Sequence, residues 1–596
     1  MPATSRPSAG VRIEAVRVNG FRALRDVCVV LDPGTTVLVG ENNAGKSAFL
    51  DALATAFGTR SAVPEDLHVD ADDRRPEAFL IDFLLVPTVG DAFEPRLEAL
   101  FGDAVRRERS EDDLGEERRQ FVAIRTIGTI GADRSIVDRR RCFIDGWSDC
   151  DGPSSSAVAE IPGQRVTERH LALISLTLLH ASRDLVAEMR RRTSRWGRLL
   201  AQRDLAQDIE KQVEDQLRDL GELVLGKSPV LGRLRHRLDE VQQAMPTVEQ
   251  VELEPLPTRI SDLHRATDVV VKAPKGPRLP LRLQGLGSRS LAELMVYRAF
   301  AAELPGTEER FSPHLVACFE EPEAHLHPHA QFAVMGIIDQ VPGQRIVTTH
   351  SPQIAGTANL GQIRLFRHSE SGIEVGRSGD LGEEEQIKTR RLLDRSYGQV
   401  FFARLIIIGD GTTEHAALPV FARARWGVEP ESLGVTFVDP GGLAAANFLI
   451  KALEGLGIPW LALVDGDKGG SGALRAISNQ VGRTVDQHSQ EVVMLPAGAD
   501  LERYLVDERL HVGIKQGIAD LYGSDALAKF SRRRKHLSLS EDEILEEFLD
   551  KNKGTYGAAV AEAIVTAPNE NGAPTIPERI EELLSRADRI LGMNPP

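Results

Sequence analysis

Residues Gly40–Ser47 read GENNAGKS, an eight-residue P-loop that ends in a Lys-Ser pair. An apolar strand is predicted before it at Thr36–Val39 and a helix after it at Ser47–Phe57. In such a loop the backbone N–H groups face phosphates, the lysine reaches the β- and γ-phosphates and the hydroxyl binds Mg²⁺. The sequence therefore predicts an ATP site, with Ser47 also as a metal ligand. Its binding residues are Gly40, Asn43, Gly45, Lys46 and Ser47.

Two later strands end in groups that suit nucleotide hydrolysis. Leu315–Pro328 reads LVACFEEPEAHLHP, and its apolar run ends at Glu320 and Glu321. We expect Glu320 to assist the Mg²⁺ of the nucleotide and Glu321 to polarise the attacking water as a catalytic residue. The strand within IVTTHSP, at Ile346–Pro352, ends at His350, which we predict to sense the γ-phosphate.

A glycine-containing turn opens a further helix. Gln284–Leu294 reads QGLGSRSLAEL, and the backbone N–H groups of Gly285 and Gly287 suit a phosphate. We expect these two glycines to contact an ATP bound to a second copy of the chain.

A second set of carboxylates follows the strands of a predicted βαβαβ unit. We expect the strands at 405–408, 434–438 and 460–464 and the helices at 413–426 and 442–456. Parallel strands end at one edge of a sheet, where such folds bind ligands. Carboxylates that converge there repel one another unless cations neutralise them, so we predict a site for Mg²⁺ or Mn²⁺. The predicted ligands are Asp410, Glu414, Asp465 and Asp467.

In this order the segments resemble known families. The P-loop, the paired glutamates and His350 are similar to the ABC-type ATPases of the SMC and RecF class. EEPEAHLHP resembles the OLD (overcoming lysogenization defect) family, and the acidic unit resembles its Toprim domain. The likeness extends to DLERYL and KNKGTYGAAVAEAI, which implies Glu502 as a further metal ligand and Lys553 as a catalytic cation at the scissile phosphate. It also implies DNA as substrate and a homodimer or larger homo-oligomer.

Three positions depart from the family patterns. Gln284 stands where ABC signatures usually carry Ser, and Glu320 replaces the commoner Asp. The usual VEG of a Toprim domain is GDG here, so Asp410 is one methylene shorter than the expected Glu. The resemblance therefore implies ATP binding more firmly than rapid hydrolysis, and altered cleavage at the metal site.

The predicted fold class is α/β. We expect an ABC/SMC-type P-loop ATPase head with a helical dimerisation insertion, followed by a Toprim parallel α/β domain. The expected boundaries are a disordered N-terminus at 1–10, ATPase segments at 11–182 and 248–370, the insertion at 183–247, a linker at 371–400 and the Toprim domain at 401–596.

Composition narrows the function without deciding it. The net charge is −16, so DNA binding requires local basic patches, with candidates at Arg139–Arg141, Arg190–Arg192 and Arg532–Lys535. The four cysteines lack CxxC spacing, which argues against a zinc ribbon or a disulfide framework and suits the cytoplasm. MPATSRPSAG lacks the apolar run of a signal peptide, and no apolar run is long enough to span a membrane.

The leading hypothesis is an ATP-dependent, metal-dependent DNA endonuclease that nicks or cuts DNA in antiphage defence. A Gabija-like nuclease subunit beside a helicase partner is one form of it. The alternative is a non-cutting, SMC/RecF-like DNA-binding ATPase whose Toprim domain is structural. A topoisomerase or primase is disfavoured, since no zinc-binding cysteine cluster and no distinctive nucleophilic tyrosine is present in the sequence.

Overall fold

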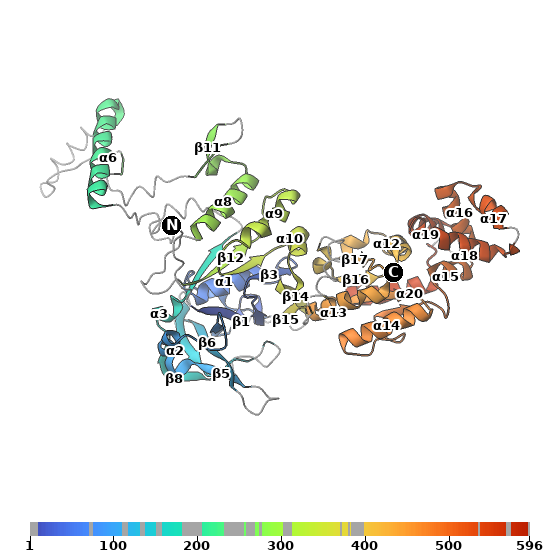
Figure 1. Ribbon diagram of the computed structural model, residues 1–596, viewed down its shortest axis with the longest axis horizontal. Helices are drawn as coiled ribbons and strands as arrows, with labels where there is room; N and C mark the ends of the chain where they lie inside the picture. Colours follow the sequence, from blue (N-terminus) through green and yellow to red (C-terminus); the bar gives the residue numbers. More distant parts are fainter. Residues whose placement is uncertain are drawn as a thin grey trace. The chain divides into compact units, whose positions relative to one another are not determined.

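The structure is a computed structural model (Figure 1). Its chain forms two compact units. One comprises Met1–Leu179, Gly306–Glu323 and Pro328–Pro596, and the other comprises His180–Pro305 and Ala324–His327. The described residues are 10–70, 76–109, 117–131, 137–148, 150, 158–180, 206–231, 256–257, 269–272, 277–301, 313–369, 372–378, 382, 385, 398–534, 537–567 and 574–593.

The P-loop strand lies inside a mostly parallel sheet of the first unit. The sheet order is β15-β14-β3-β13-β12-β9, in which only β15 is antiparallel to its neighbour. The strands are β3 (Thr35–Gly40), β9 (Ile174–Leu179), β12 (His314–Glu320), β13 (Gln344–Thr348), β14 (Ile363–Ser369) and β15 (Gly372–Arg377). Strand β3 lies between β14 and β13 and is buried along its whole length. Its carboxyl end, and those of β12 and β13, therefore open on the same edge of the sheet.

A second, antiparallel sheet packs against helix α1 (Lys46–Ala56). The sheet order is β2-β1-β4-β6-β7-β8, with β5 paired to β6. The strands are β1 (Val11–Phe21), β2 (Leu24–Val30), β4 (Ala78–Pro87), β5 (Arg106–Arg109), β6 (Glu117–Ile130), β7 (Val137–Ile144) and β8 (Glu160–Arg165). The buried apolar side chains of both sheets and α1 form one core, which fixes the helix that follows the P-loop. Short helices α2 (Pro95–Phe101), α3 (Glu168–Leu171), α9 (Pro328–Ile338) and α10 (Pro352–Thr357) complete this part.

The basic segment Arg139–Arg141 on β7 has a structural role. Arg139 donates to the carbonyl oxygens of Thr55 and Arg60, and Arg141 donates to that of Ala56. These cations thus satisfy carbonyls at the C-terminal end of α1, where positive charge is favoured. Arg140 pairs with Glu160 instead. This candidate DNA patch is therefore largely occupied by the protein's own groups.

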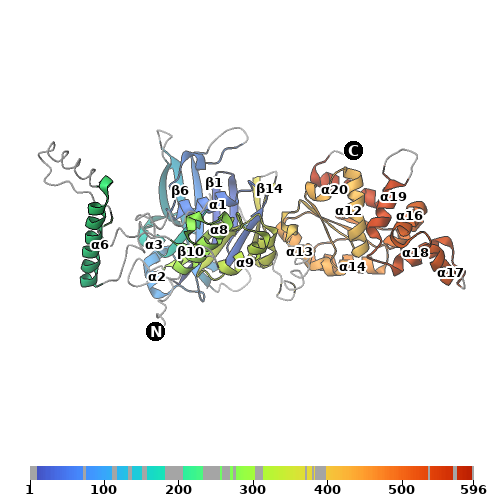
Figure 2. The same ribbon diagram turned by 90° about the horizontal axis from the view of Figure 1, so that it is seen from above.

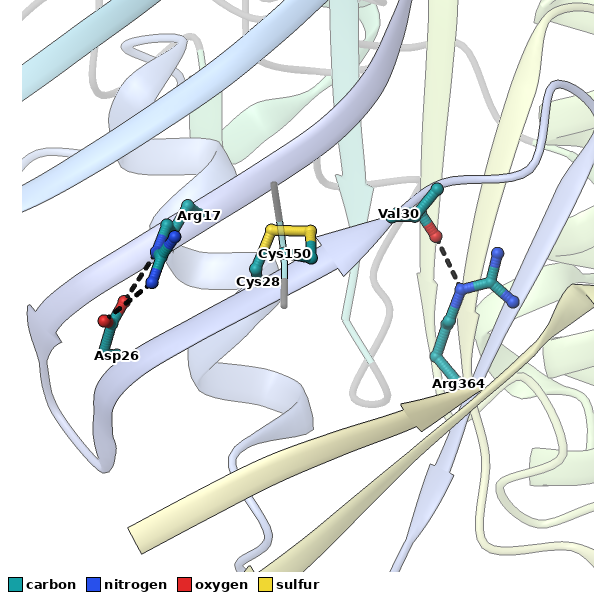
Figure 3. Close-up of a disulfide and its surroundings, with 6 residues drawn as sticks. All are labelled: Arg17, Asp26, Cys28, Val30, Cys150 and Arg364. Carbon is teal, nitrogen blue, oxygen red and sulfur yellow. Dashed lines mark hydrogen bonds and ion pairs between the residues drawn. A yellow bond between two sulfur atoms is a disulfide. The ribbon is translucent and has the colours of Figure 1, made fainter. Parts of the chain in front are cut away.

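Cys28 and Cys150 form a disulfide, 122 positions apart in the sequence (Figure 3). The expectation of no disulfide is wrong for this pair, although Cys142 and Cys318 are free and buried. The spacing of the cysteines did not indicate this pair, because it depends on Cys150 packing against an apolar cluster of the antiparallel sheet, far along the chain from Cys28. Figure 3 also shows Arg364 donating to the carbonyl oxygen of Val30 at 2.6 Å, a bond that joins β14 to the end of β2.

The second unit contains helices α6 (Gln207–Lys227) and α8 (Leu286–Ala301) and the hairpin of β10 (Val270–Lys272) and β11 (Arg278–Pro280). Helix α6 falls within the predicted helical insertion, and the rest of 183–247 lies outside the described residues apart from 206 and 228–231. The predicted disordered N-terminus (except Gly10) and most of the predicted linker also lie outside them.

The C-terminal part is built on a four-stranded parallel sheet of order β17-β16-β18-β19. Its strands are β16 (Leu405–Ile408), β17 (Val435–Val438), β18 (Trp460–Val464) and β19 (Val492–Met494). Its helices are α12 (Thr412–Trp426), α13 (Asn447–Leu456), α14 (Lys468–Val481), α15 (Leu501–Asp507), α16 (His511–Tyr522), α17 (Ala526–Arg534), α18 (Glu541–Lys551), α19 (Gly557–Thr566) and α20 (Glu578–Leu591). Figure 2 shows α16, α17, α18 and α19 grouped together. None of the helices in the described part of the chain has the length and apolar character needed to cross a bilayer.

A buried ion pair joins two central strands of the antiparallel sheet. Arg125 on β6 donates from Nε and Nη2 to the carboxylate of Asp82 on β4, at 2.8 Å each, and the Asp82 side chain is 0% exposed. Removing one member of such a pair leaves the other charged group buried and unpaired, which typically costs about 3–5 kcal/mol.

We predict that Asp82→Asn lowers the stability of the part that contains the antiparallel sheet by about 3 kcal/mol, because Arg125 keeps its charge but loses its anion. Urea unfolding of the full chain measures this change as a lower midpoint of the unfolding transition of that part. Asp138→Asn, at an exposed position of β7, is the matched control and should leave the midpoint unchanged. Equal midpoints for both variants would contradict the role given to the pair.

Candidate functional site

The P-loop adopts the conformation that its glycines permit. Gly40 ends β3 with φ 146°, and a Cβ there would lie 2.2 Å from the carbonyl oxygen of Phe366. Gly45 precedes α1 with φ 88°, and a Cβ there would lie 2.7 Å from Leu24. Any larger side chain would clash at both positions. The loop can therefore turn tightly from the sheet into α1 and present its N–H groups at the helix start, where an anion binds well.

Lys46 lies at the first position of α1 and is 4% exposed. Its Nζ donates to the carbonyl oxygens of Gly40 and Glu41, at 2.8 Å each. Burial lowers the pKa of Lys46 to about 8, and the charges of Glu321 and Glu323 oppose that shift only in part. Bound phosphates would favour the charged form of Lys46, so this lysine is well placed to bind a nucleotide.

The catalytic groups predicted for ATP hydrolysis lie at the same edge of the sheet. Glu320 is the last residue of β12 and Glu321 follows it with φ 42°. Nε2 of His350, just beyond β13, lies 3.7 Å from Oε1 of Glu321. Burial and the charge of Lys46 lower the pKa of His350. The 3.7 Å distance shows that the structure brings Glu321 and His350 together, and the charge of Glu321 also raises the pKa of Lys46.

Sequence reasoning missed Glu323, which holds the loop that carries His350. Its Oε1 accepts hydrogen bonds from Thr349 Oγ1 at 2.7 Å, from the N–H of His350 at 2.8 Å and from the N–H of Ser351 at 3.2 Å. Its Oε2 is buried without a hydrogen-bond partner. One carboxylate from the β12 end thus fixes the backbone of the β13 end. The only signal in the sequence was a third acid in EEPE.

The predicted signature glycines belong to the second unit. Gly285 precedes α8 and Gly287 is the second residue of that helix. A Cβ at Gly287 would lie 2.8 Å from the carbonyl oxygen of His325, whereas none of the described atoms comes within 4 Å of a Cβ at Gly285. Their role toward a second ATP stays a prediction.

The C-terminal sheet gathers its carboxylates at the ends of β16 and β18. Asp410 follows β16, and its Oδ1 accepts the N–H of Leu443 at 2.6 Å. Glu414, in the first turn of α12, accepts the N–H of Gly411 at 3.0 Å. Burial raises the pKa of Glu414 to about 7, and the charges of Glu502 and Asp410 add to the shift. These acids therefore lie close enough to oppose one another's ionisation.

The DxD segment follows β18, a parallel neighbour of β16, so its acids lie at the same edge of the sheet as Asp410 and Glu414; we call this acidic edge the carboxylate crevice. Burial raises the pKa of Asp465 to about 8, with contributions from the charges of Glu414 and Asp410. Asp467 begins α14, and its Oδ1 accepts the N–H of Gly470 at 2.8 Å. A Cβ on Gly466 would lie 1.9 Å from the carbonyl oxygen of Pro496, so only glycine fits between the two aspartates.

Lys553 faces this crevice through an ion-pair cluster. Its Nζ lies 3.2 Å from carboxylate oxygens of Asp500, Glu502 and Asp550. Burial opposes its charge, but Glu502 and Asp500 raise the pKa of Lys553 overall. Glu502 is 2% exposed and accepts a hydrogen bond from the hydroxyl of Tyr556 at 2.5 Å. The predicted ligand Glu502 and the predicted cation Lys553 are thus in direct contact.

Asp500 and Tyr556 were missed by sequence reasoning. Asp500 begins α15 by accepting the N–H of Arg503 at 3.0 Å. Burial opposes its ionisation, but that hydrogen bond and Lys553 lower the pKa of Asp500 overall. The fully buried Tyr556 holds Glu502. Asp500 stands two positions before Glu502, a spacing like that of the DxD, which is the one signal that could have indicated it.

The donor set fits a hard divalent cation by chemistry. Six carboxylates act on one another at this edge, and Lys553 contacts two of them; the six belong to Asp410, Glu414, Asp465, Asp467, Asp500 and Glu502. Carboxylate oxygens are the ligands that Mg²⁺ and Mn²⁺ prefer. Among the described residues, no three acidic, histidine or cysteine side chains already form a compact metal-binding group. Binding would therefore draw these side chains closer together.

Two protein-family models match separate parts of the chain. The family described as "AAA domain, putative AbiEii toxin, Type IV TA system" matches residues 35–355, and "Overcoming lysogenization defect protein-like, TOPRIM domain" matches residues 401–467. The chain is 24% identical to "OLD nuclease" of Thermus scotoductus, over 76% of this chain and 82% of that protein. It is also 24% identical to "Uncharacterized protein YbjD" of Escherichia coli, over 86% of this chain and 88% of that protein.

A solved structure, the C-terminal region of the OLD protein of Xanthomonas campestris pv. campestris, is 20% identical, with a TM-score of 0.26, over 32% of this chain and 98% of that one. From the two family matches and the sheets described above, the predicted fold class is confirmed as an α/β ATPase followed by a parallel Toprim domain.

We predict that Glu323→Ala slows ATP hydrolysis by about 10²-fold, because the backbone of His350 loses its anchor and a small misplacement of a reacting group has effects of this size. Nucleotide affinity should change less than the rate, since the P-loop contacts of Lys46 remain and Glu323 acts on Lys46 only through its charge. Steady-state kinetics and calorimetry measure the two quantities.

Glu323→Gln is the matched control for that change. It keeps an oxygen acceptor in nearly the same shape and should recover most of the rate. A wild-type rate in Glu323→Ala would show that Glu323 does not position the loop.

Proposed function

Because the chain belongs to the AAA-domain family that matches residues 35–355 and carries an OLD-like TOPRIM domain, we propose that it is an ATP-dependent, divalent-metal-dependent DNA endonuclease. The observation that carries the proposal is the convergence of carboxylates at the carboxyl edge of the C-terminal sheet. Burial raises the pKa values of Glu414 and Asp465, and repulsion from neighbouring acids adds to both shifts, as expected where a cation belongs among the acids.

We assign Asp410, Glu414, Asp465, Asp467 and Glu502 as the residues that would hold the metal. When bound, Mg²⁺ or Mn²⁺ would activate water and stabilise the leaving oxygen of a phosphodiester. Asp467 has a second duty, since it caps α14. That cap fixes the backbone of the DxD and thereby orients both aspartates.

Lys553 would supply the positive charge at the scissile phosphate. Its ion pairs with Asp500 and Glu502 hold it at the crevice and keep it protonated. A phosphate that approached it would find a cation already in position, which is how fixed charges lower the energy of a transition state. Tyr556 orients Glu502 and so acts as a positioning residue.

The nucleotide site would regulate this chemistry. We propose that Gly40, Asn43, Gly45, Lys46 and Ser47 hold ATP and that Glu320 assists its Mg²⁺, with Ser47 as a further metal ligand. Glu321 would orient the attacking water while His350 contacts the γ-phosphate. Gly285 and Gly287 would complete the site on a second copy, so the proposed active form is a homodimer. The exposed Ile209, Leu220 and Leu223 of α6 support a role of the helical insertion in that association.

Antiphage defence and a Gabija-like helicase partner are further parts of the proposal and rest on family resemblance alone. Location in the cytoplasm is also proposed. The Cys28–Cys150 disulfide counts against that location, because structural disulfides are rare in reducing compartments.

The second candidate function is a DNA-binding ATPase that does not cut. One observation favours it: Asp410, the shortened residue of the GDG segment, already bonds to the N–H of Leu443. If that bond persists with metal present, Asp410 contributes less to the site, and cleavage is weak or absent.

We predict that the double variant Asp465→Asn, Asp467→Asn loses DNA cleavage by about 10²–10³-fold or more, the scale expected when fixed charges at a reacting group are removed. Asn preserves shape, and at 467 it preserves the helix cap. Conversion of supercoiled plasmid in Mg²⁺ and in Mn²⁺, with and without ATP, measures the effect. Nucleotide affinity should remain at the wild-type value.

Asp486→Asn is the control, since Asp486 is exposed in a loop of the same domain. It should cut at the wild-type rate. Undiminished cutting by the double variant would place the nuclease site elsewhere. A wild type that cuts with neither metal would favour the second candidate.

A further inference from the structure

Helix α17 (Ala526–Arg534) displays three cations on one exposed face. Lys529, Arg532 and Arg533 are spaced i, i+3 and i+4, so their side chains project from the same side of the helix. All three are exposed. The chain as a whole carries a net charge of −16, so this concentration of positive charge differs from the average surface.

These three cations lack carboxylate partners within the part of the chain that the structure describes. Their neighbour Arg534 is different, since it pairs with Glu547 at 2.9 Å and lies over the ring of Phe530 at 5.7 Å. Arg532 donates to the carbonyl oxygen of Ala528 at 3.2 Å, but that bond does not neutralise its charge, and the three cations repel one another at this spacing. An external anion would relieve that repulsion.

The opposite face of α17 is anchored. Phe530 packs edge-on against Phe548 of α18 with ring centroids 5.2 Å apart, and Nζ of Lys551 lies 5.5 Å from its ring centroid. Leu527 also packs against the core of the domain. The helix is therefore held in one orientation, and its charged face is presented outward on a fixed support.

Side-chain contacts connect the helix pair α17 and α18 to the segment of Lys553 at the candidate cleavage site. Phe548 also packs against Tyr522, at the end of α16, with ring centroids 5.6 Å apart. The hydroxyl of Tyr522 bonds to Oγ1 of Thr555, two residues after Lys553. The basic face and the segment of Lys553 are thus carried by one packed group of side chains.

The helix macrodipole explains only part of this arrangement. Cations in the last turn stabilise a helix C-terminus, which accounts for Arg532, Arg533 and Arg534. It does not account for Lys529, which lies one turn earlier and completes the row. The basic segment of β7 differs, because Arg139 and Arg141 there donate to carbonyl oxygens of another segment, whereas Nε of Arg532 donates to the carbonyl oxygen of Ala528 within its own exposed helix.

We propose that the face of α17 formed by Lys529, Arg532 and Arg533 is a docking surface for the phosphate backbone of duplex DNA. It would hold the duplex that flanks the bond at the carboxylate crevice, without reading its sequence, as phosphate contacts do. This inference rests on the proposed function, since it concerns the substrate of the same domain.

The test uses the triple variant Lys529→Gln, Arg532→Gln, Arg533→Gln in the full chain. Asp465→Asn and Asp467→Asn are added to prevent cutting during the measurement. Binding to a fluorescent 30-base-pair duplex is followed by anisotropy over a series of KCl concentrations. Each lost phosphate contact should reduce the slope of log K against log [KCl] by about 0.9, so a reduction of about 2–3 is expected.

The matched control removes the same charge from scattered exposed positions, as Arg96→Gln, Arg475→Gln, Arg589→Gln. It should retain the wild-type slope. An unchanged slope in the α17 variant, or an equal reduction in the control, would overturn the proposal. The proposal would also be overturned if the α17 variant kept its DNA binding but lost binding to anionic lipid vesicles, measured in parallel.

The outcome is separate from that of the proposed function. Plasmid cleavage by the wild type decides whether the domain cuts DNA. The change in salt slope decides whether α17 binds it, and a reduced slope would support the docking surface even if the wild type proved unable to cut.

Discussion

Repulsion among carboxylates at the carboxyl edge of a parallel sheet is the constraint on which the C-terminal part depends. Strands β16 and β18 are neighbours, so the acids that follow them must share one crevice. The chain limits the cost with local donors: Leu443 for Asp410, Gly411 for Glu414, and Gly470 for Asp467. Lys553 neutralises the side formed by Asp500 and Glu502. Asp465 has the most strongly raised acid pKa of this crevice, which marks where a cation is needed.

The P-loop site is also built where parallel strands end, but its buried charged group is positive. Strands β3, β12 and β13 also end at one edge, but there the buried group is a cation, Lys46, whose pKa is lowered by burial. Anionic phosphates would complete that site as cations would complete the other. Glu323 links two of the strand ends by holding the His350 loop. Both sites are therefore arranged to receive a charge that the chain does not supply.

Local patterns let the sequence predict much of this. The P-loop, the DxD and the strands 405–408 and 460–464 follow from residues adjacent in the chain, and the structure places those strands at the same positions. What escaped prediction depends on contacts between distant residues. Glu323 meets residues 26–28 positions away, Tyr556 meets Glu502 across 54, and Cys28 meets Cys150 across 122. Basic composition alone did not distinguish Arg139–Arg141, which bind their own fold, from the exposed row on α17.

The central claim is that the carboxylate crevice binds a divalent metal. Titration of nucleotide-free protein with Mn²⁺, followed by the electron paramagnetic resonance signal of the free ion, tests it most directly. The account predicts that wild-type protein and Lys46→Ala bind Mn²⁺ to the same extent, because the nucleotide site is not involved. Binding should be lost when Asp465 and Asp467 are both replaced by Asn. Failure of the wild type to bind, or full binding by that double variant, would contradict the account.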